Sequence, residues 1–157
     1  MPSDLDGGSD EAYGLRVFLH HYCVHLSGPD VDGAMTPFTG DRRAARGFNG
    51  DIARHHSAWI EAVGTAHPAE LGRRVSRKTL LAVAGLVSVN DNTWTTDREL
   101  ATRRWSVRHP SLRAGLEQLL AWTDGDVLAD DAAVEQAVRG AVSTIVEQFA
   151  ADIGLWS

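Results

Sequence analysis

The sequence predicts an all-α fold, a bundle of about five helices with a short helix at its N-terminal end. Apolar residues recur at spacings of three and four along most of the chain, which is the period of an amphipathic helix. Asp, Thr and Pro stand where such helices would begin, and Gly and Asn stand where they would end. With 157 residues and 43% hydrophobic content, the chain can bury one sizeable core without a second domain.

In the N-terminal part, the sequence predicts a tail, a short helix and a strand. Residues 1–12 are mostly small and acidic, without the basic and apolar blocks of a secretory signal, and we expect a flexible tail. From Tyr13 to His21 the spacing of Leu15, Phe18 and Leu19 predicts a helix. The β-prone stretch Tyr22–Leu26 then predicts one strand. Since a lone strand leaves its backbone groups unpaired, either this stretch is not a strand or its sheet is missing from the chain.

In the middle of the chain, the sequence predicts a connector and two helices. Gly33, Pro37 and Gly40 interrupt residues 31–40, which we interpret as an extended connector. Asp41 can then cap a helix that runs to about Gly64. After the break at Ala66-His67-Pro68, a long amphipathic helix, the expected core element, continues to the break at Asn90-Asp91-Asn92.

The last third predicts three further helices. Thr96 or Asp97 caps a short helix through Trp105, and Pro110 opens a second helix that stops at Asp124-Gly125-Asp126. The final helix runs from near Asp130 to near Ile153. Its apolar residues follow the spacing of a helix packed along a bundle: Val134, Val138, Val142, Ile145, Val146 and Phe149.

Charge and composition narrow the classes of partner. The net charge of -6 argues against general binding of nucleic acid or of an anionic membrane, because both depend on positive surface. No apolar run approaches the roughly 18 to 20 residues that cross a bilayer. Cys23 is the single cysteine and cannot form an internal disulfide. We therefore expect a cytoplasmic protein whose partner is a small neutral or cationic ligand.

Known motifs for metal and nucleotide chemistry do not occur. The seven histidines include the pair His21 and His25 at helical spacing, but no His-Glu-x-x-His pattern completes a zinc site. No phosphate-binding glycine loop and no nucleophile elbow is present either. We therefore predict no metal site, no catalytic residue and no cofactor bound by this chain.

The connection from Asn90 to Arg98 is the candidate binding site. It combines carboxylates, amides, hydroxyls and an aromatic ring, a mixture that suits a polyhydroxylated amine. The candidate residues are Asp91, Trp94, Thr96, Asp97 and Trp105. The alternative is structural: the polar residues cap the two flanking helices and the two tryptophans close the core. Capping explains Asp91 and Trp94 less readily than the others.

A second hypothesis concerns Arg104 and His109. Their Arg-x4-His spacing resembles that of the HEPN family of helical ribonucleases, in which an Arg and a His on one helix act on a phosphodiester. This resemblance implies a dimeric ribonuclease or a toxin-antitoxin partner. In this chain Trp105 follows the Arg where the family usually has a polar residue, and Pro110 places the pair at a helix end.

The order of these features resembles the C-terminal part of aminoglycoside adenylyltransferases of the streptomycin and spectinomycin type. The resemblance runs from Tyr13 to Trp156 and rests on the turn Leu26-Ser27-Gly28-Pro29, the connector with Pro37, the long helix and the loop before Trp105. It implies that residues 13–40 are the end of a nucleotidyltransferase domain plus a connector, and that residues 41–157 are the substrate-binding helical bundle.

The same resemblance implies that the catalytic half is elsewhere. In that family an N-terminal domain with a Gly-Ser motif and metal-binding carboxylates transfers AMP from ATP, with Mg, to an antibiotic and so gives resistance. Those motifs do not occur here, so we expect binding of an aminoglycoside-like cation but no activity without a separate nucleotidyltransferase subunit. A homodimer is the alternative assembly, and a truncated gene fragment is a third interpretation.

Overall fold

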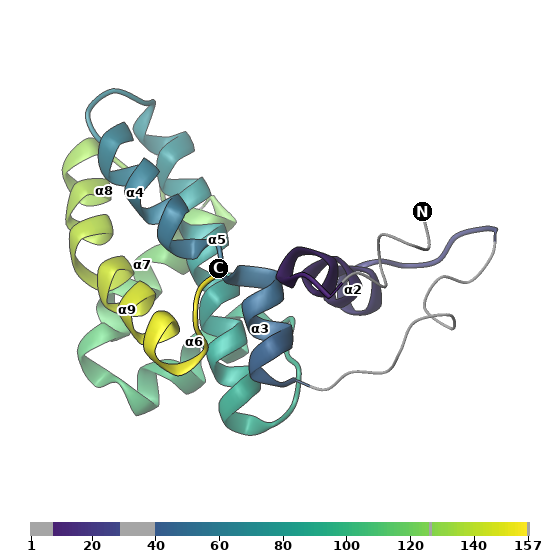
Figure 1. Ribbon diagram of the computed structural model, residues 1–157. Coiled ribbons are helices and arrows are strands. Elements are labelled where there is room, and N and C mark those ends of the chain that lie inside the picture. Colours follow the sequence, from purple (N-terminus) through teal and green to yellow (C-terminus); the bar gives the residue numbers. More distant parts are fainter. Residues whose placement is uncertain (1–7, 29–39, 126, 157) are drawn as a thin grey trace.

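The computed structural model describes residues 8–28, 40–125 and 127–156, and in these ranges the chain is helical without any strand (Figure 1). The all-α class is therefore confirmed. In chain order the elements are α2 (Asp10–Tyr22), α3 (Arg42–Asn49), α4 (Ile52–Ala62), α5 (Pro68–Asp91), α6 (Arg98–Arg108), the 3-10 turn η2 (Pro110–Leu112), α7 (Arg113–Asp124), α8 (Asp131–Ala137), the π-helical segment η3 (Val138–Val142) and α9 (Ser143–Asp152).

Helix α5 is the central element of the bundle, as the sequence predicted. It packs against α3, α4, α6, α7, α8 and α9. Most of its residues from Leu71 to Ser88 are buried, and they form the main core together with Trp59, Trp105, Leu116 and Phe149. A helix buried on so much of its circumference needs apolar or small residues nearly all round, which the run Leu80–Val87 provides.

The predicted cap at Asp41 is confirmed, Asp97 and not Thr96 caps α6, and Asp130, near the predicted start of the last helix, caps α8. In each case the carboxylate accepts a hydrogen bond from the backbone N–H three residues later, at 2.8, 2.9 and 2.8 Å respectively. At the end of α5, Asn92 adopts the left-handed conformation with φ 52°, which Asn tolerates better than most residues. These local signals therefore set the helix boundaries on either side of the candidate loop.

Two predictions about local structure were wrong. Tyr22 is the last residue of α2, and residues 23–26 have no regular structure and are exposed, so the predicted strand Tyr22–Leu26 is not formed. The helix expected from Asp41 to about Gly64 is two helices, because the chain turns at Gly50 and Asp51. A Cβ at Gly50 would lie 2.2 Å from Cδ1 of Trp156, so this turn is shaped by contact with the far end of the chain.

Helix α2 lies to one side of the bundle and docks on α3 (Figure 1). The backbones meet at two glycines: a Cβ on Gly14 would lie 2.0 Å from the Gly47 carbonyl oxygen. Tyr13 and Val17 are buried beside Ala44 in a second, smaller core. Tyr13 and Val17 are therefore core residues and do not belong to a surface left open by a missing sheet.

The last helix contains a π-helical segment that the sequence did not predict. Segment η3 joins α8 to α9 with one extra residue in its turn. The His56 ring of α4 approaches the Val138 carbonyl oxygen, with Nε2 at 2.9 Å. Gly115 of α7 leaves room for the Ala141 methyl group, since a Cβ there would lie 2.5 Å from that methyl. The segment thus fits the last helix against α4 and α7.

The domain division at residues 12 and 40 stays a prediction. Most of the predicted tail, residues 1–7, and most of the predicted connector, residues 29–39, lie outside the described residues. The described part of the segment 13–40 is chiefly α2, which begins three residues earlier than expected and packs closely on α3.

Candidate functional site: the loop between α5 and α6

The loop from Asn92 to Asp97 is fastened to the end of α5 by hydrogen bonds. The backbone N–H of Thr93 donates to the Ser88 carbonyl at 3.0 Å, and the backbone N–H of Thr95 donates to the Ser88 hydroxyl at 3.0 Å. Ser88 is fully buried, and its hydroxyl donates to the Ala84 carbonyl at 2.6 Å. One buried serine therefore fixes the path of the loop over the end of the core.

Trp94 joins the loop to the small core under α2. Its indole stacks on the His21 ring with centroids 5.3 Å apart and meets the Phe48 ring edge-on at 6.3 Å. Trp94 is half-buried and packs against both hydrophobic cores. The indole N–H is buried without a hydrogen-bond acceptor among the described residues. Trp94 is consequently a packing residue with part of its ring still open to solvent.

The Tyr22 hydroxyl lies near this indole but is also without a hydrogen-bond partner in the described part of the chain. Burial raises the pKa of Tyr22, while the nearby indole N–H of Trp94 and the positive charge of Arg98 oppose that rise. A tyrosine of this kind stays neutral at physiological pH, and its hydroxyl is buried next to the loop.

Asp91 is held by two guanidinium groups of α6. Arg104 approaches Oδ2 at 2.6 Å and Arg108 approaches Oδ1 at 2.5 Å. The Arg108 hydrogen bond holds the pKa of Asp91 below its usual value, since it and the Arg104 contact outweigh the opposing effect of burial. Asp91 therefore ties the end of α5 to α6, and its charge is already neutralised.

The other predicted residues divide between surface and core. Thr96 and Asp97 are exposed, and the Asp97 carboxylate caps α6. The Thr96 hydroxyl makes no hydrogen bond within the described residues. Trp105 is only 2% exposed, and its indole N–H donates to Oε1 of Gln148 at 3.1 Å, as expected of a residue that closes the core. Four of the five candidates thus share one connection, with Trp105 in the core behind them.

Arg104 and His109 are engaged on different sides of α6. Arg104 pairs with Asp91 at the end of α5, whereas Nδ1 of His109 lies 3.3 Å from Nε2 of Gln148 on α9. Five residues along a helix correspond to about 140° of rotation. Within one copy of the chain, these two side chains do not face a common position, as general acid-base catalysis by the pair would need.

A second polar group, which the sequence analysis missed, lies between α4 and α5. Asp51 forms an ion pair with Lys78 at 2.7 Å and lies 3.0 Å from Nε2 of His55. Burial raises the pKa of Asp51, but the Lys78 ammonium and His55 outweigh burial, so the pKa is below its usual value. Only the spacing of Asp51 and His55 by four residues was visible in the sequence, because Lys78 belongs to another helix.

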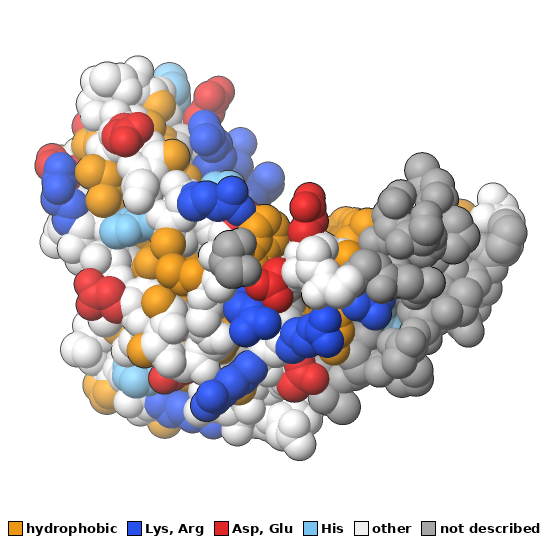
Figure 2. Space-filling model, viewed as in Figure 1, with side chains coloured by type: hydrophobic (Ala, Val, Ile, Leu, Met, Phe, Trp, Pro, Cys, Tyr) orange, Lys and Arg blue, Asp and Glu red, His pale blue; other side chains and the backbone are white. Residues whose placement is uncertain are grey.

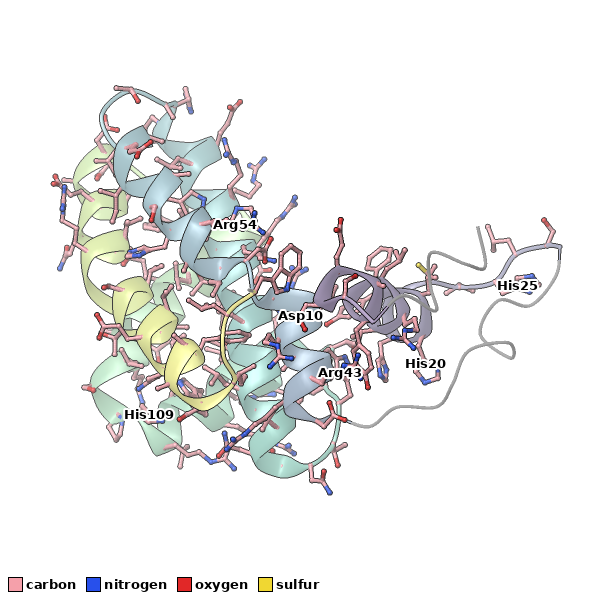
Figure 3. All side chains as sticks on the ribbon, in the orientation of Figure 1. Asp10, His20, His25, Arg43, Arg54 and His109 are labelled. Atoms are coloured by element: carbon pink, nitrogen blue, oxygen red, sulfur yellow. The ribbon has the colours of Figure 1, made fainter. Side chains whose placement is uncertain are left out.

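His21 and His25, the pair that the sequence places at helical spacing, are not both in α2, because the helix ends at Tyr22. His21 stacks on Trp94, and Figure 3 shows His20 on α2 and His25 beyond its end, away from the bundle. Within the described ranges, no group of three or more His, Cys, Asp or Glu side chains is placed to hold a metal ion. No described helix is both long and apolar enough to cross a membrane.

Comparison with known proteins gives no relative on which to base a function. No family model, no curated protein and no solved structure matches the chain. The function must therefore be inferred from the residues and their geometry.

Proposed function

We propose that this chain is a helical recognition domain of the nucleotidyltransferase type, whose α5–α6 loop binds a small polycationic ligand such as an aminoglycoside. Transfer of AMP to that ligand would require a separate subunit that supplies ATP, metal and catalytic carboxylates. The resemblance of the element order to aminoglycoside adenylyltransferases suggests this class, and the placement of the loop beside α2 supports it.

The contact of Trp94 with His21 carries the proposal. It sets the loop directly beside the C-terminal end of α2. The outer face of α2 exposes Leu15 and Phe18, which are 45% and 43% accessible, while the opposite face is buried on α3. Exposed apolar side chains of this size, next to one another on a helix, are typical of a surface that binds a partner. A ligand in the loop would then border the docked catalytic subunit.

The loop offers the groups that a polyhydroxylated amine needs. Asn92 and Thr96 expose an amide and a hydroxyl, and Asp97 exposes a carboxylate. Since Asp91 is already paired with two arginines, we assign it to holding the loop and Asp97 to meeting the cation. The half-buried indole of Trp94 supplies an aromatic edge for a sugar ring.

The test is isothermal titration of the purified chain with streptomycin and with spectinomycin. We expect one of them to bind, and Thr96→Ala to weaken binding by about three- to tenfold, the effect of one lost hydrogen bond. Ser111→Ala, which removes an exposed hydroxyl from η2, is the matched control and should bind as the wild type does. Trp94→Ala should abolish binding.

Two results would contradict the proposal. One is the lack of any binding heat with either antibiotic. The other is equal weakening by Thr96→Ala and Ser111→Ala, which would show that the loop is not where the ligand binds.

A further inference from the structure

A group of cationic side chains lies on the outer edge of α4 and α5. Arg74 and Arg77 are exposed on α5, and Arg54 is exposed on the neighbouring α4. Residues three and four apart are neighbours on a helix surface, so Arg74 lies next to both Arg77 and Lys78. Figure 2 shows Lys and Arg side chains gathered along this edge, and Figure 3 shows Arg54 there, far from His109 at the other end of the bundle.

Asp51 is the carboxylate that is paired at this edge, and its partner is Lys78, not one of the three arginines. Asp51 is paired with Lys78 at 2.7 Å and contacts His55. Among the described residues, Arg54, Arg74 and Arg77 form no ion pair. The chain as a whole carries a net charge of -6, so a local excess of arginine runs against its composition. Exposed guanidinium groups that form no ion pair can attract an anion.

The edge also has a hollow whose lining in the described part of the chain includes Arg54, while Arg74 and Arg77 lie outside that lining. The hollow has a volume of about 320 Å³ and is lined by Asp51, Arg54 and His55. The Arg54 guanidinium lies over the Trp156 ring, 5.2 Å from its centroid. Trp156 is itself fixed, because its indole N–H donates to the Arg46 carbonyl at 2.7 Å and its backbone N–H donates to the Gly50 carbonyl at 3.0 Å. Arg54 is therefore positioned before any ligand arrives.

We propose that this edge binds a small phosphate-bearing ligand, with Arg54, Arg74 and Arg77 as its anion-binding residues. The planar guanidinium group donates two parallel hydrogen bonds to phosphate oxygens, which makes arginine the usual residue for such ligands. The volume of the hollow is at the lower end of the range for small-molecule sites. The net negative charge disfavours a long nucleic acid, which would extend beyond the cationic edge.

The site is independent of the proposed loop function, and it is tested by titrating the full chain with pyrophosphate at low ionic strength. We expect measurable binding that Arg74→Gln with Arg77→Gln weakens at least tenfold. The matched control, Arg103→Gln with Arg139→Gln, removes the same charge from exposed positions on α6 and η3 and should change affinity less than twofold. All four side chains are exposed, so thermal melting should show that both variants are folded.

Three results would overturn the proposal. Equal weakening in both variants, or no binding by the wild type, would show that the edge is not a phosphate site. In a parallel titration, a single-stranded RNA oligonucleotide that binds more tightly than pyrophosphate, with steep salt dependence and loss in the Arg74 and Arg77 variant, would identify a nucleic-acid surface instead.

Discussion

At the scale of single residues, two aspartates show how the fold uses charge. The side chain of Asp91 is 18% exposed and that of Asp51 is 19% exposed. Asp91 is held between Arg104 and Arg108 of α6. Asp51 is held between Lys78 of α5 and His55 of α4. Both carboxyl groups therefore have a pKa below the usual value. Asp91 connects α5 to α6 at the candidate loop, and Asp51 connects α4 to α5 at the cationic edge. Each is a structural contact beside a candidate site.

The first prediction concerns Asp51 and pH. A carboxyl group whose pKa is lower in the folded chain adds stability above its unfolded pKa of about 3.9, and that stability is lost as the pH falls through the folded value. Asp51→Asn should thus lower the free energy of unfolding by about 1 to 2 kcal/mol at neutral pH. The difference from the wild type should shrink in urea unfolding as the pH falls below about 3.9 and this carboxyl becomes protonated in both states.

Asp131→Asn is the control for this measurement, because Asp131 is exposed in the first turn of α8. It should cost only a few tenths of a kcal/mol at neutral pH, as an exposed charge near a helix N-terminus does. A cost for Asp51→Asn that persists unchanged in acid would mean that packing, and not the ion pair, explains the loss.

At the scale of elements, the contact of α2 with α3 depends on two glycines. A Cβ on Gly47 would lie 2.8 Å from the Gly14 nitrogen and 2.9 Å from the Asp10 carbonyl oxygen. These are backbone atoms that cannot move without displacing the helix. Gly47→Ala should therefore release α2, and hydrogen exchange should show loss of protection in Asp10–Tyr22 while α5 stays protected.

The control is Gly140→Ala in η3, where a Cβ would meet nothing within 4 Å. That substitution should leave the exchange of α2 unchanged and should raise overall stability by a few tenths to about 1 kcal/mol, since alanine favours helix. Normal protection of α2 in Gly47→Ala would show that this helix is not held by the glycine contact.

The helices were largely predictable because their signals are local. Asp41, Asp97 and Asp130 cap helices as expected, and α5 has the predicted core role. The failures involve distant parts of the chain. The break at Gly50 is shaped by Trp156, and the stretch Tyr22–Leu26 has strand-forming residues but no neighbouring strand to pair with. The extra residue of η3 could not be predicted, because the apolar residues around it follow ordinary helical spacing.

At the scale of the whole molecule, the candidate loop was predictable but its internal contacts were not. Sequence spacing places Asp91, Trp94, Thr96 and Asp97 in one connection. It could not show that Asp91 is neutralised by α6, or that Trp94 rests on His21 of α2. The cationic edge was also missed, because Arg54 and Arg74 belong to separate helices, α4 and α5, whose packing the sequence does not show.

The outer face of α2 gives a prediction about assembly. Leu15 and Phe18 are exposed on this face, and without a partner subunit they should drive self-association. Light scattering should show an average mass that rises with protein concentration, and Leu15→Ser with Phe18→Ser should keep the chain monomeric. Val107→Ser with Leu128→Ser, which changes two apolar residues outside α2 that are 72% and 71% exposed, should behave as the wild type. A wild-type chain that is monomeric throughout would count against this role for α2.

The most direct test of the proposed function is an NMR titration of the nitrogen-15-labelled chain with streptomycin. The chain has five tryptophans, and Trp94→Phe identifies which indole N–H signal belongs to Trp94. We predict that the ligand shifts this signal and the amide signals from Asn92 to Asp97, while the indole signal of the buried Trp105 stays unchanged. A spectrum that does not change, or changes confined to residues outside the loop and the adjoining end of α2, would contradict the account.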